Sequence, residues 1–63
     1  MRVNGVTRDA DARSVRELLD ELGYDGRGIA VARNGEIVPR SSWSETQLHD
    51  EDVVEIVTAA AGG

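Results

Sequence analysis

Ser14-Val15-Arg16-Glu17-Leu18-Leu19-Asp20-Glu21-Leu22-Gly23, residues 14–23, is the stretch that decides the fold. Ser14 and Glu17 have the spacing of a capping box, in which the serine oxygen accepts from the Glu17 amide and the glutamate reaches back to the Ser14 amide. Gly23 supplies the left-handed cap that ends a helix. The sequence therefore predicts one amphipathic helix, with its apolar side chains at the i, i+3, i+4 and i+7 spacing of a single stripe: Val15, Leu18, Leu19 and Leu22.

Predicted hairpins flank this helix on both sides. Asn4-Gly5 lies between the apolar residues Val3 and Val6, and Asn34-Gly35 lies between the segments 29–33 and 36–38. Asn-Gly is the strongest short hairpin signal, because both central positions of a type I′ turn require a positive φ. Pro39 closes the second hairpin, since proline cannot donate to a strand ladder. Each side of the helix therefore contributes a pair of antiparallel strands.

The last predicted strand is residues 53–58, Val-Val-Glu-Ile-Val-Thr. Alternation places Val54 and Ile56 on one face and Val53, Glu55 and Val57 on the other. The order ββαβββ lets this strand lie parallel beside the first, with the helix crossing one face in the usual right-handed sense. We therefore expect an α+β fold of the ubiquitin-like β-grasp type, with a mixed sheet. The expected domain is 1–58, followed by a flexible tail, 59–63.

The composition of the 63 residues excludes several classes of function. The chain has no cysteine and one histidine, so it cannot form disulfides, build a zinc site or carry sulfur as a persulfide. Seven basic residues, all arginine, against twelve acidic ones give a net charge of −5, which disfavours nucleic acid as a partner. No apolar run approaches a membrane span, and the N-terminus lacks the apolar stretch of a signal peptide, so we expect a cytoplasmic protein with no membrane partner.

The tail Ala59-Ala60-Ala61-Gly62-Gly63 is the most informative feature. A featureless, frayed end is the ordinary interpretation of such a segment. After the last strand of a β-grasp pattern, however, two glycines make a thin thread that fits a narrow tunnel, and the Gly63 carbonyl carbon is open to attack. We expect Ala61 and Gly62 to enter a partner's active site. ATP can convert the Gly63 carboxylate into an acyl-adenylate, and a sulfur nucleophile can then leave a thiocarboxylate.

Several pieces of the sequence form an ordered set: 34–40, Trp43, Leu48, Asp50, 54–59 and Gly62-Gly63. Together they resemble the ThiS family, the sulfur carriers of thiamine thiazole biosynthesis. The piece that runs from Val38-Pro39-Arg40 to Trp43 favours ThiS over its nearest relative, the small subunit of molybdopterin synthase. Two departures are a short first strand and Asp50-Glu51-Asp52 in place of the family's Asp-Gly-Asp, which would strain Glu51 if that position required a positive φ.

The resemblance implies a sulfur carrier that serves as co-substrate and is not itself an enzyme. An E1-like adenylyltransferase of the ThiF type would adenylate Gly63, a cysteine-derived persulfide would supply sulfur, and a thiazole synthase of the ThiG type would use the thiocarboxylate. No bound cofactor is expected, because ATP is used by the activating partner. Three alternatives stay open: a sulfur carrier for another pathway such as molybdopterin synthesis, a ubiquitin-like modifier that forms stable conjugates, and an interaction module with an inert tail.

One pair of valines is a candidate for partner binding, and the remaining polar and aromatic residues favour structural interpretations. Val53 and Val57 are candidates for an apolar docking patch, because ubiquitin-like carriers commonly present this face to the activating enzyme; an ordinary pair of exposed valines is the alternative. Trp43 is expected to pack over an edge of the sheet. His49 is expected to be a solvated loop residue, and Asp50-Glu51-Asp52 a solvated turn without the spacing of a calcium loop. No catalytic or metal-binding residue is assigned.

Overall fold

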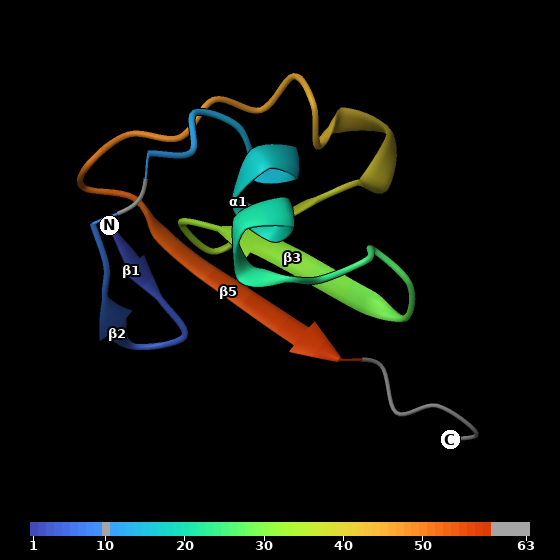
Figure 1. The fold of residues 1–63 in the computed structure, drawn as a ribbon, viewed down its shortest axis with the longest axis horizontal. Coiled ribbons are helices and arrows are strands. Elements are labelled where there is room, and N and C mark those ends of the chain that lie inside the picture. Colours follow the sequence, from blue (N-terminus) through green and yellow to red (C-terminus); the bar gives the residue numbers. More distant parts are fainter. Residues whose placement is uncertain (10, 59–63) are drawn as a thin grey trace.

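The computed structural model describes residues 1–9 and 11–58 as one helix, one short 3-10 helix and a five-stranded sheet. The ββαβββ order predicted from the sequence is confirmed (Figure 1). In chain order the elements are β1 Arg2–Val3, β2 Val6–Thr7, α1 Val15–Leu22, β3 Ile29–Arg33, β4 Glu36–Val38, the 3-10 helix η1 Arg40–Ser42 and β5 Val53–Thr58.

The sheet places the last strand at its centre, in the order β2-β1-β5-β3-β4. β5 is parallel to β1 and antiparallel to β3, and each hairpin is antiparallel within itself. The helix α1 crosses one face of this mixed sheet (Figure 1). The parallel pairing of the first and last strands, predicted from the sequence, is therefore confirmed.

The termini of α1 follow the predicted capping with one difference. The Ser14 side chain accepts from the Glu17 amide at 3.2 Å, but the Glu17 carboxylate accepts from the amide of Arg13 at 2.9 Å and not from that of Ser14. Gly23 adopts a φ of +86° and its amide donates to the Asp20 carbonyl. The helix is thus fixed at both ends by local hydrogen bonds.

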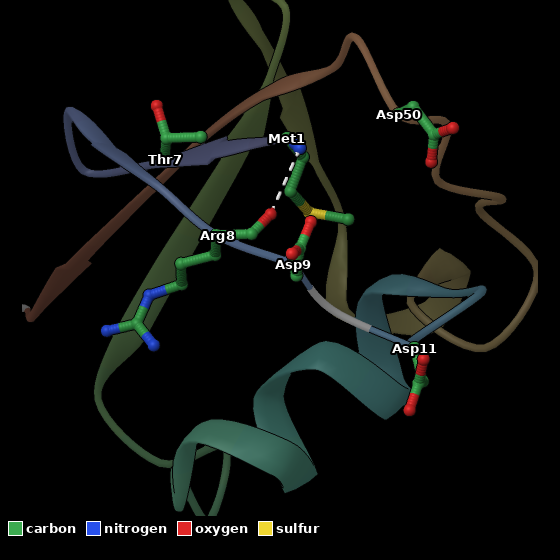
Figure 2. Close-up of a pocket in the computed structure, with 6 residues that line it drawn as sticks. All are labelled: Met1, Thr7, Arg8, Asp9, Asp11 and Asp50. Atoms are coloured by element: carbon green, nitrogen blue, oxygen red, sulfur yellow. Dashed lines mark hydrogen bonds between the residues drawn. The ribbon is translucent and has the colours of Figure 1, made fainter.

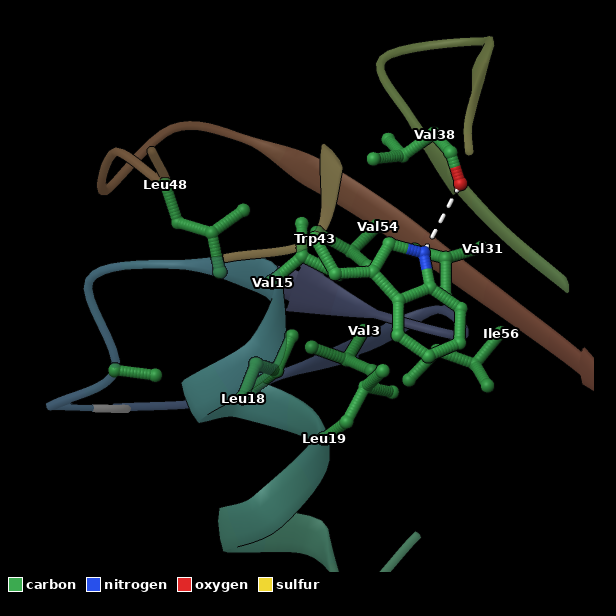
Figure 3. Close-up of a cluster of buried hydrophobic side chains, with 11 residues drawn as sticks. Val3, Val15, Leu18, Leu19, Val31, Val38, Trp43, Leu48, Val54 and Ile56 are labelled. Atoms are coloured by element: carbon green, nitrogen blue, oxygen red, sulfur yellow. Dashed lines mark hydrogen bonds between the residues drawn. The ribbon is translucent and has the colours of Figure 1, made fainter. Parts of the chain in front are cut away.

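The core lies between α1 and the sheet, and Trp43 is part of it (Figure 3). Trp43 is 3% exposed, and its indole Nε1 donates to the Val38 carbonyl at 3.0 Å. Its structural role is confirmed, although the ring lies within the core itself. The guanidinium groups of Arg16 and Arg40 lie over it, 5.9 and 5.4 Å from the ring centroid. The buried apolar side chains are Val3, Ala12, Val15, Leu18, Leu19, Val31, Val38, Trp43, Leu48, Val54 and Ile56.

Both Asn-Gly pairs form the predicted hairpin turns. Asn4 and Asn34 each have a φ of +52°, and the glycines that follow have values of +81° and +85°. These are the two positive values that a type I′ turn requires. The first hairpin is short, because β1 and β2 have two residues each. Its pairing with β5 is accordingly limited to Arg2 and Val3.

The prediction of a wholly solvated turn at residues 50–52 was wrong for Asp52. Asp50 and Glu51 are exposed, but Asp52 is 6% exposed and accepts from Arg33 Nε at 2.9 Å, Asn34 Nδ2 at 3.0 Å and the His49 amide at 2.8 Å. The Glu51 strain does not arise, since Asn4 and Asn34 are the only described non-glycine residues with a positive φ.

The ionisation of Asp52 reflects this setting. Burial disfavours the charged form, but hydrogen bonds from Arg33, Asn34 and the His49 amide outweigh it and lower the pKa of Asp52 to about 2. Through these hydrogen bonds, the Asp52 carboxylate links the end of β3 and the turn that follows it to the loop that precedes β5.

Candidate functional site

The face of the sheet opposite α1 carries a group of exposed apolar side chains. Val53 and Val57 of β5 are 45% and 61% exposed, and Ile37 of β4 is 71% exposed. Directly paired residues of neighbouring strands point to the same face. Ala30 pairs with Val57, and Ala32 lies between Ile37 and Glu55, so all of these residues share one surface. We call the group Val53, Val57, Ile37, Ala30 and Ala32 the open-face patch.

The open-face patch extends the surface predicted from the sequence. Val53 and Val57 lie where alternation placed them, and Glu55 lies between them on the same face. Ile37, Ala30 and Ala32 were missed as members, because a hairpin sequence gives no register with the distant strand β5. An apolar surface with one carboxylate inside it is suited to a protein partner that offers apolar contacts and one basic group.

The C-terminal end of β5 is held by a side chain as well as by strands. The Asn4 side chain bonds the backbone of Ile56 twice, accepting from its amide at 2.7 Å and donating to its carbonyl at 3.2 Å. On the opposite edge, β3 pairs with β5 as far as Ile29 and Thr58. Thr58 is therefore the last residue of a strand that is fixed on both edges up to Ile56.

The predicted reactive segment begins directly after Thr58. Ala61, Gly62 and Gly63 lie outside the described residues, as does the whole predicted tail, 59–63. Their roles stay predictions.

A shallow pocket of about 560 Å³ lies near the N-terminus (Figure 2). The Met1 amino group donates to the Arg8 carbonyl there at 3.3 Å. Asp11 and Asp50 project from separate segments and do not converge on one point (Figure 2). Within residues 1–9 and 11–58, no group of three or more His, Cys, Asp or Glu is arranged to hold a metal ion. The lining residues are Met1, Thr7, Arg8, Asp9, Asp11 and Asp50.

The described part of the chain contains no helix long and apolar enough to cross a membrane. Taken together, the central last strand, the single helix on one face and the open second face define a ubiquitin-like β-grasp protein. Its fold matches the crystal structure of the thiamine biosynthesis protein ThiS from Geobacter metallireducens with a TM-score of 0.84 and 32% sequence identity, over 98% of this chain and 96% of that one.

The chain belongs to the ThiS family, whose family model matches residues 1–63. It is 34% identical over 61 residues to the sulfur carrier protein ThiS of Thermus thermophilus. This match covers 97% of this chain and 95% of that protein. It is also 47% identical over 62 residues to a thiazole synthase of Paramagnetospirillum magneticum. That match covers 97% of this chain but only 19% of the synthase, so the chain spans about a fifth of the length of that relative.

Proposed function

We propose that this protein is a sulfur carrier for thiamine biosynthesis and that the carboxylate of Gly63 is the group that carries the sulfur. The single observation that supports this most is the family match, which extends over residues 1–63 and so includes Gly62 and Gly63, four and five residues beyond the end of β5. Two relatives named sulfur carrier protein ThiS match this chain along nearly their whole length. The protein acts as a co-substrate of partner enzymes.

The proposed chemistry proceeds in three steps. A carboxylate oxygen of Gly63 attacks the α-phosphorus of ATP, which forms an acyl-adenylate and releases pyrophosphate. The terminal sulfur of a persulfide then attacks the acyl carbon, and AMP leaves. A thiol finally cleaves the sulfur–sulfur bond, which leaves the thiocarboxylate on Gly63 and the donor in a disulfide. The activating partner, an E1-like adenylyltransferase of the ThiF type, supplies the ATP site.

The proposed client is a thiazole synthase of the ThiG type. The match to about a fifth of a thiazole synthase supports this choice, because in that protein a segment like this chain is joined to the rest of the synthase. A second thiazole synthase, from Magnetococcus marinus, likewise contains a segment similar to this chain, at 33% identity. No finding favours a molybdopterin client. The cytoplasmic location predicted from the sequence stays a prediction.

The open-face patch is the proposed docking surface for the activating partner. Its large apolar side chains, Val53, Val57 and Ile37, are already exposed, and Glu55 offers one charge for pairing. The strand that carries Val53 and Val57 is also the strand that leads to the tail. A partner that holds this face therefore controls where the tail begins.

The test is a mass measurement on the chain ending at Gly63. Incubation with ATP, the E1-like partner and a persulfide donor should replace one oxygen by sulfur on Gly63. Deletion of Gly63 should abolish the change, because it shortens the reach by about 3.3–3.6 Å, and even a ~1 Å misplacement can slow a reaction ~100-fold. Ala60→Ser keeps both the reach and the terminus and is the matched control that should react normally.

The opposite result would favour one of the alternatives. If the Gly63 deletion gains sulfur as readily as the intact chain, the carrier function is wrong and an interaction module takes its place. If stable conjugates to lysines of other proteins form instead of free thiocarboxylate, the chain is a modifier.

A further inference from the structure

β1 ends before β5 does, and in the described part of the chain no strand continues along this edge of β5 beyond Val54. β1 pairs with β5 only through Arg2 with Val53 and Val3 with Val54. β3, on the other edge, pairs with β5 as far as Thr58. Among the described residues, the second half of β5 therefore has a neighbouring strand on one side only.

The side chain of Asn4 occupies the position where β1 would have continued. The Asn4 backbone amide still donates to the Val54 carbonyl at 2.9 Å, as a strand residue would. The backbone then turns away at a φ of +52°, and the side-chain amide makes both hydrogen bonds to Ile56. Asparagine suits this place because it tolerates a positive φ and carries an acceptor and a donor together.

We propose that Asn4 is a positioning residue for the adenylation of Gly63, an inference that rests on the proposed function. By bonding Ile56, Asn4 keeps the end of β5 in the sheet, so that the segment after Thr58 starts from a fixed point. Release of two strand residues would shift that starting point by roughly 7 Å at the extended spacing of the chain. A partner would then have to order these residues again on binding. The conformational entropy lost in that ordering weakens binding more than it slows the chemical step.

Asn34 provides a matched control within the same molecule. It has the same φ of +52° in the same kind of turn, and it also bonds β5 with both backbone and side chain. Its amide donates to the Val53 carbonyl at 2.7 Å, and its Oδ1 accepts from the Val53 amide at 2.9 Å. These contacts hold the start of β5, at the end remote from the tail. A loss at Asn34 therefore lowers stability without releasing the end of β5 that leads to the tail.

The experiment compares Asn4→Gly with Asn34→Gly, because glycine accepts a positive φ and each change removes only the side-chain amide. Pyrophosphate release by the E1-like adenylyltransferase is measured with ATP while the carrier concentration is varied. Asn4→Gly should raise KM about tenfold with kcat within about twofold of the unmodified chain, since ground-state binding is what is lost. Asn34→Gly should lower Tm and leave KM within about twofold.

Two further measurements distinguish positioning from general stability. Asn4→Asp keeps the acceptor for the Ile56 amide but replaces the donor, so its KM should be intermediate. Hydrogen exchange on the carrier alone should be faster at Ile56 and Val57 in Asn4→Gly and unchanged there in Asn34→Gly. If Asn4→Gly does not fold, Asn4→Asp gives the same comparison.

The outcomes separate this inference from the proposed function. An equal rise in KM for both glycine variants, or an unchanged KM in the Asn4 variants, overturns the positioning role and leaves the carrier function intact. Failure of the unmodified chain to release pyrophosphate overturns the carrier function, and the positioning role with it.

Discussion

The two faces of the sheet share one strand and differ in what covers them. On the face toward α1, Val54 and Ile56 are buried, whereas Val53 and Val57 on the opposite face are exposed. Successive residues of β5 therefore belong to different environments. Substitutions on the covered face should change stability, and substitutions on the open face should change recognition, which makes the comparison testable with residues of similar size.

The largest expected effect is that of Leu19→Ala on the covered face. Leu19 is fully buried in the middle of the helix stripe, so its truncation should destabilise the fold by about 2–5 kcal/mol. Ile37→Ala is the matched control, because it removes a similar side chain from the open face, where the effect should stay within about 0.5 kcal/mol. Urea denaturation of both variants measures the difference. Equal losses would show that the two faces are not distinct.

The next effect concerns two acidic residues of one loop with opposite environments. Asp52→Ala removes a buried carboxylate that accepts three hydrogen bonds and should destabilise the fold by about 2–3 kcal/mol. Asp50→Ala changes an exposed carboxylate and should have an effect within about 0.5 kcal/mol. Denaturation midpoints of the two variants provide the check, and similar midpoints would remove Asp52 from the stabilising contacts.

A smaller, graded effect follows from the lowered pKa of Asp52. Because the folded-state pKa of about 2 lies below 3.8, the ordinary pKa of an aspartate side chain, the ionised carboxylate stabilises the fold above pH 4. This contribution is lost as the pH falls from about 4 through about 2. Thermal melts over this range should show a loss of stability that is smaller in Asp52→Ala. An identical pH profile for the two proteins would contradict the assigned hydrogen bonds.

The smallest expected effect on the fold belongs to the open face. Val57→Asp should change stability by no more than about 1 kcal/mol, the span of strand propensities. It should weaken binding to the activating partner about tenfold, or about 1.4 kcal/mol. Val6→Asp, at an exposed valine on the edge strand β2, is the control and should bind normally. Calorimetry measures both, and unchanged affinity for Val57→Asp would remove Val57 from the interface.

The fold could be predicted from the sequence because its signals are local. The apolar stripe of residues 15–22 and the two Asn-Gly turns each fix an element within a few residues. The burial of Asp52 was not predicted, because its partners Arg33 and Asn34 lie 19 and 18 residues earlier in the chain, at the end of β3 and in the turn that follows it. The bonds from Asn4 to Ile56, across 52 residues, were missed for the same reason. Periodicity gives the faces of a strand but not the side chains that meet its edges.

The central position of β5 also has a consequence for how the chain folds during synthesis. Its parallel partner β1 lies about 50 residues earlier, and β3 can join β1 only through β5. Until the ribosome has added β5, the nascent chain can form only local hairpins and a helix whose apolar stripe has no sheet to cover it. Folding is therefore coupled to near-completion of this domain. A molecule with an assembled sheet has already been translated up to the residue from which the reactive segment extends.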